Sequence, residues 1–318
     1  MADISILINK SEIGAGTRGS SLGPEAIITA ASNKDDSIFN GRTYEFIPDR
    51  NSTIFRSKRF KHAIRIDEVH EQLRITSFSI TNQLNDGKFP ILLSGDHSLA
   101  AGTLAGIKNA FPKKRIGAIW IDAHADLHSP FTSPSGNIHG MPLSIALQED
   151  NTEIASNRPN QEAIEYWEKL KFLSIEPPVL PEDLVILGLR SFEKAEQNLI
   201  RRKRIKHISV KECRDSGIGD TVTETLTYLK DCDLIYISFD VDCMDPDLVS
   251  YGTGTPVEDG FEVEECREML EGLCKDPRVV ALEFVEVNPC LDNKMNKMAE
   301  TAYELLEASI HILENHHK

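Results

Sequence analysis

The feature that most constrains the fold is a series of six short apolar runs with helical stretches between them. The runs are Ile4–Ile8, Pro90–Leu93, Ile116–Ile121, Leu184–Leu189, Leu234–Phe239 and Val279–Val285. They are continuous rather than alternating, as in strands that are covered on both faces of a parallel sheet. Apolar residues at helical spacing occupy Asp67–Asn85, Ser98–Ala110 and Asn296–Leu313. This order predicts a three-layer α/β/α fold with a mainly parallel central sheet, formed by residues 1–318 as one domain.

The acidic composition limits the partners of the chain. Its 318 residues carry a formal net charge of −15, and Arg201–Arg204 is the one dense basic run. Such a surface repels nucleic-acid phosphates and anionic lipid headgroups, whereas it attracts a small cationic ligand. No stretch approaches ~18 consecutive apolar residues, so we expect no membrane span.

The first residues and the cysteines both favour a cytoplasmic protein. Met1-Ala2-Asp3 has neither the basic lead nor the long apolar run of a secretory signal, so we expect no signal. The six cysteines form no C-x-x-C pair and are too sparse for a disulfide scaffold. We therefore interpret them as reduced thiols, with Cys243 as a small packing residue.

Ionisable side chains follow three of the predicted strands. The strand at 116–121 runs into Asp122-Ala123-His124-Ala125-Asp126, whose three potential ligands share one face because they alternate with alanines. A second strand ends in Asp240-Val241-Asp242, and a third is followed by Ser94-Gly95-Asp96-His97. Ligands bind beyond the carboxyl ends of strands in open α/β sheets. We therefore expect these groups to converge on one site.

Not every acidic residue in these segments is a candidate ligand. A single Asp after a strand is usually a turn former or a helix cap, and Asp96 and Asp245 fit that role because each lies beside Gly or Pro. Three ionisable groups on one face are different, since they repel one another unless a cation neutralises them. The candidate metal ligands are therefore His97, Asp122, His124, Asp126, Asp240 and Asp242.

This ligand set exceeds the needs of a single cation. A pair of ions bridged by carboxylates would use all four acids and both imidazoles. The predominance of oxygen among the ligand atoms favours Mn²⁺ over Zn²⁺. Two cations that share a water lower its pKa and fix it as a nucleophile. The set thus indicates a hydrolase for a poor electrophile, with two Mn²⁺ per subunit as cofactors.

The order of these motifs resembles that of the arginase/agmatinase (ureohydrolase) family. The matching segments are Gly14–Pro24, Ser94–Ser98, Asp122–Asp126, Ser238–Pro246 and Val285–Pro289. The resemblance covers most of the chain and implies hydrolysis of a guanidinium group by a hydroxide held between two manganese ions. It also implies the arginase-like fold and a homo-oligomer, either a trimer or a hexamer.

The resemblance assigns a role to each ligand. One ion would be held by His97, Asp122, Asp126 and Asp240, and the other by Asp122, His124, Asp240 and Asp242. Asp122 and Asp240 would then bridge the two ions. Asp126 would accept the proton of the hydroxide and help to direct it.

Further residues match the family's substrate pocket. The loop 133–142 resembles that of arginases, in which the serine matching Ser135 contacts the α-carboxylate and the histidine matching His139 relays protons. A neutral imidazole near pH 7 can protonate the leaving amine; the alternative for His139 is a loop residue that caps backbone groups. Glu286 resembles the family's guanidinium-binding carboxylate; the alternative, a surface Glu, is less natural directly after an apolar strand and beside Asn288-Pro289. Asn137 and Thr255 complete the expected pocket.

Two positions depart from the family pattern. Arginases usually carry Asn to contact the α-carboxylate where this chain has His128. They place Asp for the α-amino group where this chain has Glu193, with Glu196 as the alternative match. Both changes leave the metal chemistry intact, and they weaken L-arginine as a substrate relative to agmatine or another guanidino compound.

Several functions remain open at this point. Hydrolysis of L-arginine to L-ornithine and urea is the leading hypothesis, and the alternatives are an agmatinase, a formimidoylglutamase or another guanidino-compound hydrolase with the same metals. A non-catalytic regulator would be expected to have replaced ligands, and all six are present. A di-metal phosphohydrolase would need Lys or Arg in the metal loops, and these loops contain neither.

Overall fold

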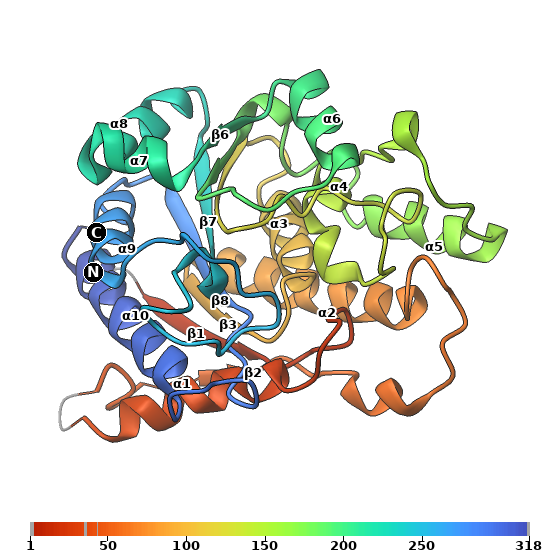
Figure 1. Cartoon of the computed structure of the whole chain (residues 1–318). Helices are drawn as coiled ribbons and strands as arrows, with labels where there is room; N and C mark the ends of the chain where they lie inside the picture. Colours follow the sequence, from red (N-terminus) through yellow and green to blue (C-terminus); the bar gives the residue numbers. More distant parts are fainter. Residues whose placement is uncertain (1–2, 35–36, 43, 317–318) are drawn as a thin grey trace.

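A parallel sheet forms the centre of the molecule. The computed structural model describes residues 3–34, 37–42 and 44–316. Met1 and Ala2, on which the prediction of no signal partly rests, lie outside the described residues. The strand order is β2-β1-β3-β8-β7-β4-β5-β6, and each neighbouring pair is parallel (Figure 1). The strands are β1 (Ile4–Asn9), β2 (Tyr44–Phe46), β3 (Phe89–Ser94), β4 (Ile116–Ile121), β5 (Leu184–Leu187), β6 (Lys206–Ile208), β7 (Leu234–Asp240) and β8 (Val279–Val285).

Helices cover both faces of this sheet. They are α1 (Gly23–Ser32), α2 (Ile66–Asn85), α3 (Leu99–Ala110), α4 (Pro142–Ala146), α5 (Gln161–Lys171), α6 (Lys194–Lys203), α7 (Val210–Ser216), α8 (Ile218–Tyr228), α9 (Val263–Leu273) and α10 (Lys297–His316). One face packs against α1 and α7 to α10, and the other against α2, α3, α4 and α6 (Figure 1). The predicted three-layer α/β/α architecture is confirmed.

Strand β4 shows why the strands of this chain are apolar throughout. Its alternate side chains enter different cores: Ile119 and Ile121 pack with α7 to α10, whereas Ala118 and Trp120 pack with α2, α3 and α6. All four are fully buried. Because both faces of the strand meet a helical layer, no position calls for a polar residue until the strand ends at Asp122.

All six predicted strands are present, and so are the three predicted helices, as α2, α3 and α10. The prediction for β5 was two residues too long, because Gly188 adopts a left-handed φ of 90° that ends the strand. Strands β2 and β6, at the two edges of the sheet, were not predicted.

The order of the strands places the candidate ligands together. Strands β3, β8, β7 and β4 are consecutive in the sheet, and their carboxyl ends lie at one edge. After β3 the chain turns sharply at Gly95, where a Cβ atom would lie 2.2 Å from the carbonyl oxygen of Ser11. Only glycine fits there, so this contact fixes the turn that carries His97 over the edge of the sheet.

Candidate metal centre and substrate pocket

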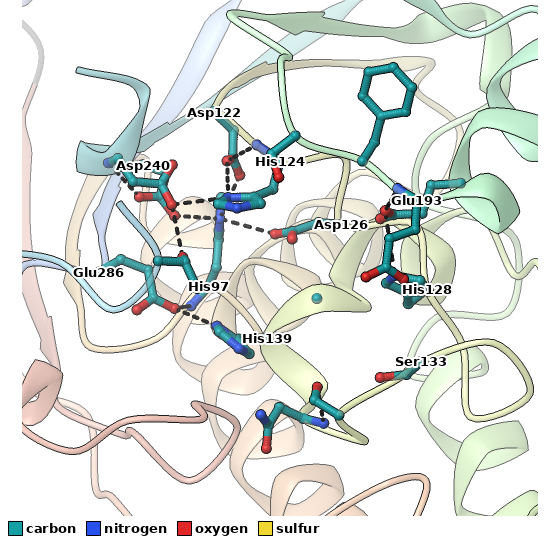
Figure 2. Close-up of a pocket in the computed structure, with 18 of the residues that line it drawn as sticks. His97, Asp122, His124, Asp126, His128, Ser133, His139, Glu193, Asp240 and Glu286 are labelled. Carbon is teal, nitrogen blue, oxygen red and sulfur yellow. Dashed lines mark hydrogen bonds and ion pairs between the residues drawn. The ribbon is translucent and has the colours of Figure 1, made fainter. Parts of the chain in front are cut away.

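The side chains predicted to form the site line a single pocket at the carboxyl edge of the sheet (Figure 2). The pocket has a volume of about 190 Å³, which suits a small metabolite rather than a polymer. The predicted residues that line it are His97, Asp122, His124, Asp126, His128, Ser135, Asn137, His139, Glu193, Asp240, Asp242, Thr255 and Glu286.

The first ligand group surrounds His97. Its Nδ1 atom lies 3.1 Å from Asp122 Oδ2, 3.2 Å from Asp126 Oδ2 and 3.0 Å from Asp240 Oδ2. Within the described chain, His97 Nδ1 and Asp126 Oδ2 are buried but make no hydrogen bond of acceptable geometry. Ligand atoms that share one octahedral ion lie about 3 Å apart. The atoms are therefore arranged around a common centre, and a divalent cation fits it.

The second ligand group shares Asp122 with the first. His124 Nδ1 lies 3.0 Å from Asp242 Oδ2 and 3.5 Å from Asp122 Oδ1. The potential ligand atoms of Asp122, His124 and Asp242 all lie within 4.8 Å of one another, as do those of His97, Asp122 and Asp240. Asp240 lies in the first of these groups, and its Oδ1 accepts the backbone N–H of Asp242, a member of the second.

Burial and crowding shift the pKa values of these groups. Burial and the charge of Asp122 raise the pKa of Asp126 to about 7. Burial lowers the pKa of His97, but its carboxylate neighbours outweigh burial and raise this pKa well above its usual value. Without cations, the cluster thus retains protons that its carboxylates share with the imidazoles. Metal ligands must be deprotonated, so a bound cation would replace these protons.

Two buried side chains support the ligands from behind, and neither was predicted to do so. The Trp120 ring stacks on the His97 ring at 4.0 Å with an interplanar angle of 4°, and its indole N–H donates to Asp122 Oδ2 at 2.9 Å. Ser238 Oγ lies 2.8 Å from His97 Nε2. Partners of this kind fix the ring orientation of a metal-binding histidine. In the sequence, both residues look like ordinary members of apolar strands.

Asp96 and Asp245 make the turn contacts expected of them. Asp96 accepts the backbone N–H groups of Gly14 and Ser98, and Asp245 accepts those of Asp247 and Gly260. Neither belongs to a ligand group.

Glu286 and His139 face each other beside the first ligand group (Figure 2). Glu286 Oε1 accepts the backbone N–H of His97 at 3.0 Å and lies 3.1 Å from His139 Nδ1. The backbone of Glu286 is left-handed, with a φ of 66°, which is uncommon for a non-glycine residue and typical of functional sites. This turn directs a buried carboxylate into the pocket, so Glu286 is not a surface residue.

The opposite end of the pocket is built around His128. Its Nε2 lies 3.0 Å from Glu193 Oε2 and 3.4 Å from Glu196 Oε2, and its Nδ1 lies 3.1 Å from Thr132 Oγ1. Glu196 is buried and also accepts the backbone N–H of Leu127 at 3.1 Å. Glu193, with an exposed fraction of 56% for its side chain, is the more accessible of the two acids. Both candidates for the α-amino position therefore lie in the pocket.

The comparisons with known proteins agree with this geometry. Residues 2–311 match the sequence model of the arginase family. The chain belongs to the arginase family. It is 34% identical over 307 residues to an arginase of Bacillus subtilis, a match that covers 96% of each chain. The structure of an arginase from Bacillus caldovelox superposes with a TM-score of 0.83 at 32% identity, covering 97% of this chain and 98% of that one. A formimidoylglutamase from Bacillus subtilis shares the fold, with a TM-score of 0.75 at 19% identity.

Membership in the arginase family makes this chain a metal-dependent hydrolase that acts on a guanidino C–N bond. The two ligand groups of the pocket are its candidate metal site. Among the described residues, no helix is both long and apolar enough to cross a bilayer, although α2 and α10 each have 20 residues.

Proposed function

We propose that this arginase-family chain hydrolyses L-arginine to L-ornithine and urea, with two Mn²⁺ ions as cofactors. The observation that carries the proposal is the Oε2 atom of Glu286. This carboxylate oxygen is buried, has no hydrogen-bond partner in the described chain and belongs to a side chain that lines the same pocket as both ligand groups. A guanidinium offers planar N–H donors that match such an acceptor, and the contact would hold its central carbon toward the ligands.

The ligand groups fit a pair of cations that share Asp122. The first ion would be held by His97, Asp122, Asp126 and Asp240, and the second by Asp122, His124, Asp242 and, as a second bridge, Asp240. When bound, the ions supply a nucleophile by lowering the pKa of a shared water. The oxygen-rich donor set supports Mn²⁺ rather than Zn²⁺.

His139 would supply a proton to the leaving amine. Burial lowers the pKa of His139, but Glu286 outweighs burial and raises this pKa to about 9. Without cations this favours the imidazolium form of the side chain, whereas a neutral imidazole was predicted from the sequence. The difference arises because a carboxylate faces the ring across the pocket, a contact that the sequence does not show. An imidazolium can protonate the departing amine and then regain its proton from solvent.

Replacing His139 with asparagine is expected to lower kcat without removing the metal. General acid catalysis typically contributes at least about 10²-fold to the rate, so we expect kcat to fall by roughly that factor. Steady-state kinetics of urea release would measure the rate, and elemental analysis of the same preparation would measure bound Mn²⁺. A loss of Mn²⁺ in the variant would mean that His139 is a ligand rather than a proton donor.

The tail end of the pocket supports agmatine as a second candidate substrate. Thr132 Oγ1 accepts the backbone N–H of Ser129 at 3.0 Å, so its own proton is available to His128 Nδ1. The other ring nitrogen, Nε2, then carries the proton and donates it to Glu193 or Glu196. This use of His128 leaves Ser135 and Asn137 to contact an α-carboxylate, while two acids remain near a tail ammonium. Agmatine has such an ammonium and no carboxylate.

A substrate panel on Mn²⁺-reconstituted protein tests the proposed function. We expect urea release from L-arginine with a higher kcat/KM than from agmatine, and no amide release from formiminoglutamate. Faster hydrolysis of agmatine would make agmatine the assigned substrate, and the proposed hydrolysis of a guanidinium group would stand. If the metal-loaded protein hydrolysed none of these compounds, the proposed function would be wrong.

The cytoplasmic location, which the first residues and the cysteines favour, and the trimeric or hexameric assembly, which the resemblance implies, remain predictions. Size-exclusion chromatography with light scattering would measure the assembly.

A further inference from the structure

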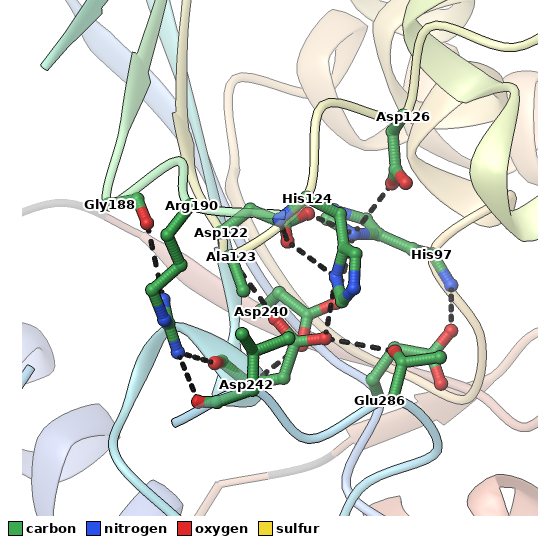
Figure 3. A network of polar contacts seen from close by, with 12 residues as sticks. His97, Asp122, Ala123, His124, Asp126, Gly188, Arg190, Asp240, Asp242 and Glu286 are labelled. Carbon is green, nitrogen blue, oxygen red and sulfur yellow. Dashed lines mark hydrogen bonds and ion pairs between the residues drawn. The ribbon is translucent and has the colours of Figure 1, made fainter. Parts of the chain in front are cut away.

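Arg190, in the loop between β5 and α6, binds four backbone carbonyl groups with its guanidinium. Nη2 donates to the carbonyls of Asp242 and Val257, each at 2.8 Å, while Nε donates to Glu258 at 2.9 Å and Nη1 to Gly188 at 3.2 Å. Figure 3 shows the side chain reaching from its own loop to the segment that carries Asp242. The guanidinium thus ties the loop after β5 to the loop after β7.

The backbone of Arg190 holds a second ligand segment. Its N–H donates to the carbonyl of Ala123 at 3.0 Å, and the N–H of Ser191 donates to the same oxygen at 2.9 Å. Ala123 lies between Asp122 and His124, and its own N–H donates to Asp242 Oδ1 at 3.2 Å. One residue therefore connects the segments that present Asp122, His124 and Asp242.

These three ligands are the members of the second group, and the first group has different supports. His97 is held by Ser238 Oγ and by the stacked ring of Trp120. The described contacts of Arg190 include neither His97 nor Asp240. The two ligand groups thus share Asp122 and are linked by the hydrogen bond from the N–H of Asp242 to Asp240 Oδ1, whereas the described contacts of Arg190 go to the segments of the second group.

The guanidinium of Arg190 is held by neutral groups. In the part of the chain that the structure describes, its guanidinium forms no ion pair with a carboxylate and is bound by neutral carbonyl oxygens alone. Its positive charge is therefore not cancelled by an adjacent acid, and it lies next to the segment of Asp242.

We propose that Arg190 is a positioning residue for the second ligand group, so that its loss weakens one of the two metal ions and spares the other. The inference rests on the two-ion site of the proposed function. Supporting residues of metal sites typically contribute about 10- to 100-fold to metal affinity. Lysine keeps the charge but cannot span four carbonyls, and glutamine loses the charge as well.

The test compares Arg190→Lys and Arg190→Gln with wild-type protein and two controls. Arg278→Lys is the matched control, because Arg278 also binds backbone carbonyls, those of Leu229 at 2.6 Å and Leu226 at 3.2 Å, away from the pocket. Ser238→Ala is the reciprocal variant, since it removes the partner of His97. Titration with Mn²⁺ alone by calorimetry gives the affinity of each ion, and electron paramagnetic resonance distinguishes a coupled pair from a single ion. Circular dichroism and thermal unfolding of the metal-free proteins check the fold.

We expect wild-type protein to bind two ions, and Arg278→Lys to bind both with the affinities of the wild-type protein. In Arg190→Lys the affinity for the ion of the second ligand group should fall about 10-fold or more, and in Arg190→Gln it should fall further. Anomalous scattering from crystals at limiting Mn²⁺ should then place the remaining ion at His97, whereas Ser238→Ala should favour the site at His124. Wild-type-like binding of both ions, or an equal loss of both, in the Arg190 variants would overturn the inference. A wild-type protein that binds one ion would instead overturn the two-ion site, and the inference with it.

Discussion

Replacing Asp122 with asparagine is expected to abolish turnover by disturbing both ligand groups at once. Asp122 Oδ2 faces His97, and Asp122 Oδ1 faces His124, so this side chain belongs to both groups. Catalytic metal ions contribute several kcal/mol to a reaction, and a loss of about 4 kcal/mol corresponds to roughly a 10³-fold slower rate. We therefore expect kcat to fall by at least about that factor, together with the Mn²⁺ content. Urea release and elemental analysis measure the two quantities.

Asp183→Asn is the matched control for this variant. Asp183 is also a buried carboxylate, but it pairs with Arg115 at 2.7 Å, away from the pocket. We expect the control to lose stability and retain its metal. Asp240→Asn is expected to abolish turnover like Asp122→Asn, because Asp240 faces the same His97 nitrogen. Wild-type activity with full metal content in Asp122→Asn would contradict the shared-ligand arrangement.

The sheet was predictable where its strands are buried on both faces. Strands such as β3 and β4 are buried at every position, so burial left an uninterrupted apolar run in the sequence. The edge strands carry no such run. All three residues of β2 (Tyr44–Phe46) are exposed, and β6 (Lys206–Ile208) begins with a lysine and a histidine. A strand of three residues at an edge is determined by its neighbour rather than by its own composition.

The ligands were predictable because their spacing carries the signal. Asp122, His124 and Asp126 alternate with alanines directly after an apolar run, and the structure brings all three to the pocket. Their supporting contacts have no such signal. Arg190 acts through carbonyl groups, which every residue possesses, and so its partners are decided by the path of the chain. Trp120 fits its strand equally well as a core residue.

The raised pKa of His139 was missed for a related reason. Its cause, Glu286, is 147 residues away in the sequence. The left-handed backbone of Glu286 also has no local signal, because glycine or asparagine would be the residue expected at a φ of 66°. A pattern in the sequence indicates which groups are present, whereas the distances between them follow from the fold.

Replacing Glu286 with glutamine is expected to impair substrate binding while leaving the metal in place. The amide can still accept the backbone N–H of His97, which Glu286 Oε1 accepts at 3.0 Å. An N–H₂ group in place of the free oxygen would oppose the N–H groups of a guanidinium, and the charge would be lost. Hydrogen bonds to charged groups are worth up to about 3 kcal/mol, which is roughly a 10²-fold loss in kcat/KM for L-arginine. Steady-state kinetics at constant Mn²⁺ content would measure it.

The same variant tests the link between Glu286 and His139, because the carboxylate raises the pKa of His139 to about 9. Without the carboxylate this pKa should fall, so the loss of the imidazolium, and of activity on the alkaline side, should move to lower pH. Glu286→Asp separates the two effects: its shorter side chain keeps the charge that raises the pKa but draws the oxygens back from the substrate. We expect Glu286→Asp to lower kcat/KM but to shift the alkaline limb of the pH–rate profile less than Glu286→Gln does. The profile would be measured from pH 6 to about pH 10. An unchanged alkaline limb in Glu286→Gln would show that His139 does not donate the proton, even if substrate binding were lost.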